Sequence, residues 1–386
     1  MMMGDPSAPV PAGDLAIAEY LWKNDSSSHS GVAPEASALQ QLGPRPLPFF
    51  LSLLHAHYQT EPQQATKALA GLKKIQSVSA PPPSAPLPTV AQFGRAALRD
   101  YGVDFPESTP RVVVIPSLIN PANILDITPE RSLLRWLSRH DIHPYLLDWG
   151  DVTSADHGLS IADHITECIV PLLKSFRTPV HLIGYCLGGT MAYAAAAITP
   201  VASLTMIAAP WHFKRYGSQQ RAAIAELWAS AQGAAKKIGL LPIEALQLMF
   251  WQLDAAATVE KYARFADMPL GTPEADLFLA MEIWANSGAP LPFPAARELF
   301  EDMIALDKPG SEAWAMGRHI ITPAHVSCPV LEVVSRTDRI VPSATAINRG
   351  RTLHLDLGHV GMVTGRQAET QLWHPLREWL SLNTKP

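Results

Sequence analysis

A chain of 386 residues is long enough for one large α/β domain with an insertion, or for two domains. Hydrophobic residues make up 47% and charged residues 17%, which is the composition of a globular protein with a sizeable core. The net charge of -5 and the lack of a basic run argue against nucleic-acid binding. Cys168, Cys186 and Cys328 are too few for a disulfide framework, so we expect a reducing compartment.

The N-terminal segment MMMGDPSAPVPAGDLA lacks the basic start and apolar core of a secretory leader. The apolar stretch 191–211 approaches the length of a membrane span, but Pro200 and Pro210 interrupt it. A helix followed by a buried strand explains this stretch better. We therefore expect a soluble, cytoplasmic protein.

Residues 1–92 are expected to form an N-terminal extension. Residues 1 to about 45 are rich in Ala, Ser, Pro and Gly, which predicts loose order. Apolar residues at spacings of three and four predict a helical region at about 47–78, and a proline-rich linker follows at 79–88. The apolar helical face is expected to pack against the main domain, with a partner contact as the alternative.

After residue 110 the chain alternates between strands and helices. This alternation predicts a mostly parallel sheet covered by helices on both faces. The expected strands are 111–115, 144–148, 180–184, 203–208, 330–335 and 351–355. The expected helices are 129–140, which starts at Pro129, then 161–173 with an interruption near Pro171, 187–197, and about 366–382.

No convincing strand lies between about 213 and 320, where the sequence is helical and rich in aromatic residues. We interpret residues 213–317 as a helical cap inserted into an α/β-hydrolase fold. The core of that fold would then comprise residues 93–212 and 318–386.

A nucleophile motif stands where the predicted strand 180–184 meets the following helix. The segment VHLIGYCLGGT contains a G-x-C-x-G pattern, which is the nucleophile elbow with cysteine in place of serine. Gly184 and Gly188 leave the space that this strained turn needs, and Cys186 would stand at a helix N-terminus that favours a thiolate. The alternative is a small buried cysteine, which is the reading we prefer for Cys168 and Cys328.

The elbow also predicts an oxyanion hole. One donor would be the backbone N–H of Leu187, directly after the nucleophile. The second donor is expected from the loop that follows the first predicted core strand, with Ser117 and Leu118 as the candidates.

The base should lie after the last strand. His359 occurs there in the segment LDLGHVGMV, between Gly358 and Gly361, which leave room for an exposed imidazole. His354 falls inside a predicted strand and His374 in the terminal helix, so neither is favoured.

The acid should follow the strand before that one. Asp338 lies three residues beyond the predicted strand 330–335, where its carboxylate could orient His359. A turn-capping role for Asp338 is the alternative. Asp356 is the rival acid, but it is expected to share the loop of His359.

A cysteine nucleophile exchanges an acyl group readily with another thiol, because the attacking and leaving sulfurs have similar basicity. This chemistry suits a coenzyme A thioester as acyl donor. His359 would deprotonate Cys186 first, and then an incoming hydroxyl group or water.

Over about residues 95 to 380 the chain resembles the polyhydroxyalkanoate synthases. The resemblance rests on six segments in order, which are 115–137, 145–150, the cysteine box GYCLGGT at 184–190, 280–292, TDRIVP at 337–342 and GHVG at 358–361. It implies Cys186, Asp338 and His359 as nucleophile, acid and base. The segment with Trp284 is similar to the synthase cap, and the stretch with Ile119 and Asn120 to the entry of the synthase core. These three residues are candidates for substrate binding or the cap.

The resemblance implies that (R)-3-hydroxyacyl-CoA is polymerised to a polyester with release of coenzyme A. No cofactor besides this thioester substrate and no metal site is expected. A homodimer through the cap, an accessory synthase subunit, a granule-associated protein and a location at polyester granules are further expectations. The chain departs from the family pattern at Ala122-Asn123, at His212-Phe213 and near Ser287.

Two other functions remain open. A cysteine-triad hydrolase or non-polymerising acyltransferase could use the same residues, and GYCLGG also resembles the box of dienelactone hydrolases. Those enzymes are compact and lack a large cap. A catalytically silent scaffold at granules is the third hypothesis, against which the complete triad argues. Acyl chain length and oligomeric state are not specified by the sequence.

Overall fold

The computed structural model describes residues 42–78, 87–102, 105–253 and 255–384. The chain divides into two compact units. A helical unit combines the described part of Met1–Pro82 with Glu226–Ile238 and Glu244–Asn286. A sheet unit comprises the described residues of Pro83–Ala225, Gly239–Ile243 and Ser287–Pro386. The predicted loose segment 1–41 and most of the predicted proline-rich linker, 79–86, lie outside the described residues.

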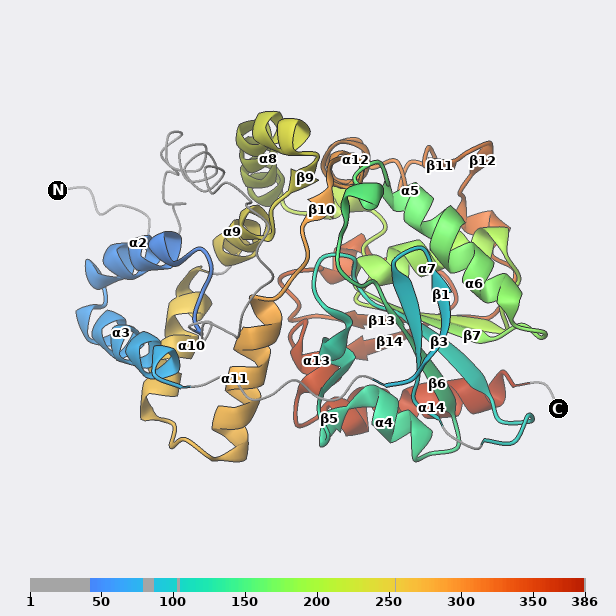
Figure 1. Ribbon diagram of the computed structural model, residues 1–386, viewed down its shortest axis with the longest axis horizontal. Helices are drawn as coiled ribbons and strands as arrows, with labels where there is room; N and C mark the ends of the chain where they lie inside the picture. Colours follow the sequence, from blue (N-terminus) through green and yellow to red (C-terminus); the bar gives the residue numbers. More distant parts are fainter. Residues whose placement is uncertain (1–41, 79–86, 103–104, 254, 385–386) are drawn as a thin grey trace, which may run out of the picture. The chain divides into compact units, whose positions relative to one another are not determined.

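The sheet unit is built on eight strands in the order β1-β2-β6-β3-β7-β8-β13-β14 (Figure 1). From β6 to β14 every neighbouring pair is parallel, whereas β1 pairs with β2, and β2 with β6, in antiparallel fashion. The strands are β1 (Thr89–Phe93), β2 (Ala96–Asp100), β3 (Arg111–Ile115), β6 (His143–Asp148), β7 (His181–Tyr185), β8 (Ser203–Ile207), β13 (Val330–Ser335) and β14 (Arg351–Leu355).

All six predicted strands are present, within one residue at each end. The β1–β2 hairpin was not predicted, and the expected start of the core at residue 93 falls on the last residue of β1. Its strands are five residues long and mix polar with apolar side chains, so no clear period of two marks them. The hairpin turns at Gly94, whose φ is +59°.

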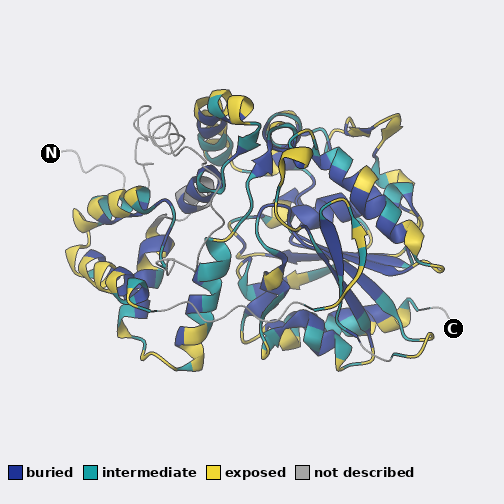
Figure 2. Ribbon diagram, in the orientation of Figure 1, coloured by how far each residue is buried: buried dark blue, intermediate teal, exposed yellow. Residues whose placement is uncertain are grey.

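Helices cover both faces of the sheet, and its central strands are buried (Figures 1 and 2). On one face lie α4 (Leu133–Ser138), the π-helical segment η8 (Glu369–Trp373) and α14 (His374–Leu382), where Trp136 and Trp373 have ring centroids 5.9 Å apart. On the other face lie α5 (Ile161–Asp163), the π-helical η3 (His164–Ile169), α6 (Val170–Ser175) and α7 (Leu187–Ile198). The mostly parallel sheet between two helical layers confirms the predicted fold class.

Two predicted helices differ from the structure. The helix expected from Pro129 begins at Leu133, because Ser132 is its N-cap and accepts a hydrogen bond from the N–H of Arg135 at 3.0 Å. The residues before it form a hairpin of β4 (Asp126–Thr128) and β5 (Arg131–Ser132). The irregularity expected near Pro171 lies earlier, in η3, since proline cannot donate to the preceding turn and its ring crowds that turn.

The segment expected to lack strands contains short ones. β9 (Leu240–Leu241) pairs with β10 (Leu291–Pro292), and β11 (Ala315–Met316) pairs with β12 (His319–Ile320), which begins just after the predicted cap. The expectation was wrong here because two-residue bridges are too short to show a period of two.

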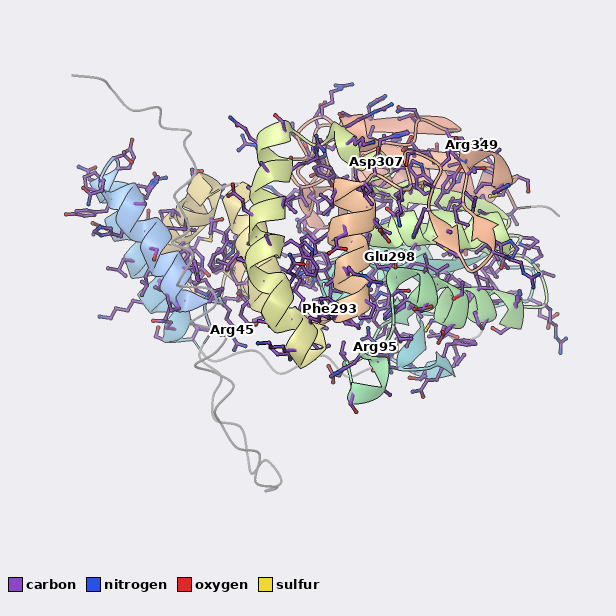
Figure 3. All side chains as sticks on the ribbon, turned by 90° about the horizontal axis from the view of Figure 1, so that it is seen from above. Arg45, Arg95, Phe293, Glu298, Asp307 and Arg349 are labelled. Atoms are coloured by element: carbon purple, nitrogen blue, oxygen red, sulfur yellow. The ribbon has the colours of Figure 1, made fainter. Side chains whose placement is uncertain are left out.

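The second half of the predicted cap folds within the sheet unit. It contains α12 (Phe293–Arg297) and the π-helical η5 (Glu298–Ala305). Glu298 accepts hydrogen bonds from the indole N–H of Trp314 at 2.6 Å and from the N–H of Ala162 at 3.1 Å, and Asp307 accepts one from the N–H of Phe213 at 2.7 Å (Figure 3). Burial raises the pKa of Glu298. These bonds tie residues 298–314 to α5 and to the segment after β8.

The helical unit contains α2 (Leu47–Tyr58), α3 (Pro62–Gln76), most of α8 (Ser218–Ile238), nearly all of α9 (Ile243–Leu253), α10 (Ala255–Asp267) and α11 (Pro273–Ala285). The single helical region predicted at 47–78 is two helices, and α3 restarts at Pro62. The apolar faces of α2 and α3 pack on α10, a helix of the predicted cap. Phe50 of α2 lies 4.6 Å from the Tyr262 ring, and α3 touches the Tyr262 carbonyl at Gly71.

None of the helices in the described part of the chain is long and apolar enough to cross a membrane.

The contact of α3 with α10 depends on Gly71. A Cβ added there would stand 2.0 Å from the Tyr262 carbonyl oxygen, so Gly71→Ala must separate the two helices. We expect it to lower the free energy of unfolding by about 1–3 kcal/mol, as overpacking does. Urea unfolding followed by circular dichroism measures this loss. Gly233→Ala on α8 is the matched control, because a Cβ there meets nothing within 4 Å and favours the helix. Equal effects of the two substitutions would contradict the packing.

Candidate active site

Cys186 occupies the sharp turn between β7 and α7. Its φ of 56° and ψ of -131° are unusual for a residue other than glycine, and its N–H donates to the carbonyl of Ile207 at 2.9 Å. The side chain therefore stands at the N-terminus of α7, at the carboxyl edge of the parallel strands. The elbow predicted from the G-x-C-x-G pattern has the geometry that the pattern requires.

The two glycines of the elbow are required by close backbone contacts. A Cβ on Gly184 would lie 2.4 Å from the Cα of Gly189. A Cβ on Gly188 would lie 2.3 Å from the carbonyl oxygens of both Ile115 and Pro116, at the end of β3. The turn at Cys186 can thus close only because neither position carries a side chain.

His359 and Asp338 form a buried hydrogen-bonded pair. His359 Nδ1 lies 2.7 Å from Asp338 Oδ2, and the other carboxylate oxygen accepts from the N–H groups of Ile340 at 2.8 Å and Val341 at 2.9 Å. The Cys186 side chain is a further hydrogen-bond partner of the His359 ring. The structure thus brings together the three side chains that the sequence singled out. Asp338 also makes the turn-capping bonds that were its alternative role.

The rival residues lie elsewhere. Asp356 pairs with Arg336 at 3.3 Å, with both side chains more than 60% exposed. His354 is exposed, and His374 lies 3.8 Å from Glu369 on the terminal helix. Burial raises the pKa of both Cys168 and Cys328 to about 11, which suits unreactive thiols.

The charge of the site favours a protonated His359. Burial lowers the pKa of this imidazole, but the negative charge of Cys186, hydrogen bonds to Asp338 and Cys186, and the charge of Asp338 together raise it to about 10 from 6.5. Protonated His359 therefore stabilises the fold below about pH 6.5, and this contribution is lost as the pH rises through 10. A cysteine side chain beside the imidazole of an Asp–His pair is well placed to act as a nucleophile.

Three N–H groups of buried residues have no acceptor among the described residues. They belong to Leu187, Ser117 and Leu118, the residues named as oxyanion donors. The next N–H in the loop, that of Ile119, donates to Ser117 Oγ at 3.3 Å and is occupied. The first N–H groups of a helix have no partner within it, and an N–H without an acceptor is available to a ligand oxygen.

Ile119 and Asn120, the candidate substrate residues of this loop, are buried and half-buried respectively. The Ile119 carbonyl lies against Gly288, where an added Cβ would come within 2.9 Å of it. Trp284 is half-buried on α11 in the helical unit, whereas the Cys186 site belongs to the sheet unit.

Two tyrosines of the site were missed by sequence reasoning. The Tyr185 hydroxyl donates to the His359 carbonyl at 3.1 Å, and its ring stacks on the imidazole at 5.2 Å. Tyr216 is close enough to Cys186 and Asp338 for burial and their negative charges to raise its phenol pKa well above the ordinary value. Tyr185 could have been suspected from its place directly before the nucleophile, but no local pattern marks Tyr216.

Comparison with known proteins agrees with this geometry. A family model described as "Alpha/beta hydrolase family" matches residues 126–370. The chain belongs to the alpha/beta hydrolase family. The fold of this alpha/beta hydrolase is also similar to a solved structure of a lipase candidate from Acinetobacter baumannii, with a TM-score of 0.50 and 15% identity over 92% of this chain and all of the other.

Within this superfamily the chain is similar to proteins named as poly(3-hydroxyalkanoate) polymerase subunits, in line with the resemblance of its sequence segments. It is 27% identical over 302 residues to the "Poly(3-hydroxyalkanoate) polymerase subunit PhaC" of Haloarcula marismortui, covering 72% of this chain but 63% of that protein. It is 24% identical over 364 residues to the protein of the same name from Synechocystis, covering 87% of this chain and 96% of that one.

The raised pKa of His359 depends on Cys186, so it should fall when the Cys186 side chain is removed. In Cys186→Ala we expect the imidazole to titrate at lower pH than in the wild type. Burial still lowers its pKa there, whereas the charge and the hydrogen bond of Cys186, which raise it, are gone. Histidine resonances followed by NMR over a pH series measure the shift. Cys328→Ala is the control, since Cys328 contributes nothing to the His359 pKa. An unchanged His359 titration in Cys186→Ala would contradict the pairing.

The two candidate acids make a matched pair of substitutions. Asp338→Asn removes the carboxylate that holds His359 Nδ1, so we expect kcat to fall by roughly 10³- to 10⁴-fold, as in other triads. Asp356→Asn removes only an exposed ion pair and should change kcat by less than about twofold. Steady-state kinetics with an acyl-CoA substrate compare the two. A larger loss at Asp356 would reverse the assignment.

Proposed function

We propose that this protein is an acyltransferase that polymerises (R)-3-hydroxyacyl-CoA through a covalent acyl-cysteine and releases coenzyme A. The observation that carries the proposal is a cysteine, not a serine, at the nucleophile elbow, paired with a histidine that Asp338 orients. A thiolate exchanges acyl groups with thioesters easily because the two sulfurs are similarly basic. The names of the relatives, which are polymerase subunits, support the same reaction.

The geometry suggests a two-stage reaction. In the reactive form His359 holds the proton of Cys186, and the thiolate adds to the thioester carbonyl to form a tetrahedral oxyanion. The N–H groups of Leu187 and of Ser117 or Leu118 would bind that oxygen. Collapse breaks the carbon–sulfur bond to coenzyme A, and the departing thiolate takes the proton from His359.

In the second stage His359 accepts the proton of a 3-hydroxyl group. The resulting oxygen attacks the acyl-cysteine, an ester bond forms, and the Cys186 sulfur leaves and recovers the proton. Hydrolysis follows the same steps with water as the acceptor, so the choice of acceptor distinguishes a synthase from a hydrolase. Ile119, Asn120 and Trp284 are the residues that we propose for the acyl chain or the cap.

The assembly and location belong to the same proposal. The relatives are named as subunits, which supports an accessory subunit for this chain. A homodimer through residues 213–317 and action in the cytoplasm at polyester granules complete the proposal. The chain spans 63% of the length of the Haloarcula relative.

Incubation with 3-hydroxybutyryl-CoA tests the function. We expect coenzyme A release, followed with a thiol reagent, together with ester-linked oligomers detected by mass spectrometry. Cys186→Ala should abolish both, because no other described cysteine has the elbow geometry, whereas Cys328→Ala should retain both. Free 3-hydroxy acid as the sole product, for every chain length, would establish the hydrolase instead. No release of coenzyme A from any acyl-CoA by a folded wild type would favour the scaffold.

A further inference from the structure

The indole of Trp149 reaches the loop that carries the second oxyanion donor. Trp149 follows β6 directly and is buried, and its Nε1–H donates to the carbonyl oxygen of Pro116 at 3.3 Å. The same carbonyl group lies against Gly188, one residue after the donor Leu187. Trp149 therefore contacts the peptide that joins the end of β3 to the elbow.

This hydrogen bond fixes the direction of a neighbouring N–H. The carbonyl of Pro116 and the N–H of Ser117 belong to one planar trans peptide, so they point in opposite directions. Holding the Pro116 oxygen holds the Ser117 N–H as well. The hydrogen bond also keeps the Pro116 carbonyl oxygen from turning towards the oxyanion hole, where negative charge would develop.

Trp149 is itself held in place by the β1–β2 hairpin. Arg95 in the hairpin turn (Figure 3) donates from Nη1 to the carbonyl of Gly150 at 2.8 Å. Gly150 has a φ of +65°, and a Cβ there would lie 2.7 Å from the Arg95 carbonyl oxygen, so hairpin and turn fit closely. The hairpin thus anchors the backbone at Gly150, directly after Trp149.

A buried histidine supports the indole ring. His164 on η3 packs edge-on against Trp149 with ring centroids 5.6 Å apart. Its Nδ1 lies 2.6 Å from the Ser160 carbonyl and its Nε2 lies 3.2 Å from Arg95 Nη2. A carbonyl can only accept and a guanidinium can only donate, so His164 is the neutral Nδ1–H tautomer. Burial lowers its pKa, which is consistent with that form.

We propose that Trp149 is a positioning residue for acyl transfer, which acts by orienting the Pro116–Ser117 peptide of the oxyanion hole. This inference rests on the proposed function, because the oxyanion forms during attack on an acyl carbonyl.

Trp149→Phe keeps the ring and removes the N–H. We expect kcat for coenzyme A release to fall roughly tenfold, less than the 10²- to 10³-fold loss of a whole oxyanion donor. KM should stay within about twofold, because the ground-state thioester needs the hole less than the transition state does. Alkylation of Cys186 by iodoacetamide creates no oxyanion, so its rate should be unchanged. Trp136→Phe is the matched control, as its indole N–H donates instead to Glu369 at 3.0 Å.

A second variant and a second measurement keep the test decisive. If Trp149→Phe does not fold, 3-benzothienylalanine at position 149 keeps the shape of the ring with sulfur in place of N–H. A trifluoromethyl ketone, to which the Cys186 thiolate adds to leave a negative oxygen, should bind roughly tenfold more weakly to either variant. This binding needs no turnover, so it is decisive even if no acyl-CoA releases coenzyme A and the proposed function fails. Unchanged kcat and ketone affinity, or equal losses in alkylation and acyl transfer, would overturn the inference.

Discussion

The site depends on how closely the backbone approaches itself around Cys186. The turn between β7 and α7 holds a non-glycine residue at φ 56°, and such a conformation persists only where the surroundings enforce it. The parallel pairing of β7 with β3 and β8 supplies that constraint. Gly184 and Gly188 let the first turn of α7 rest on the carbonyls at the end of β3. One steric constraint therefore exposes the nucleophile and brings the Leu187 N–H next to the Pro116–Ser117 peptide.

The electrostatics of the site build on this geometry. Asp338 accepts hydrogen bonds from two backbone N–H groups and from the His359 ring, so its carboxylate has little freedom to move. Tyr185 holds His359 in two ways, since its hydroxyl donates to the His359 carbonyl and its ring stacks on the imidazole. Burial alone would favour neutral imidazole, yet the combined negative partners outweigh it and raise the His359 pKa. The ion pair that results is suited to attack on a thioester.

The β1–β2 hairpin has a role beyond extending the sheet. Through Arg95 and Gly150 it anchors the turn after β6, and through Trp149 that turn reaches Pro116. Two hydrogen bonds thus link the hairpin to the turn, and the turn to the loop. Rigid support of this kind matters in acyl transfer, because donors that are already oriented need no rearrangement when the oxyanion forms.

The sequence by itself determined the elbow, the triad and the order of the core strands along the chain. These features leave local signals, such as paired glycines around Cys186, apolar strand runs, and an acid and a base that each follow a strand. The sequence favoured Asp338 over Asp356, because Asp338 follows a separate strand. Only the tertiary structure showed their partners, which are His359 for Asp338 and the exposed Arg336 for Asp356. It also revealed the hairpin, Tyr216, Trp149 and the packing of α2 and α3 on α10. Those depend on contacts between residues far apart in the chain, and long-range contacts leave no periodic trace in a single sequence.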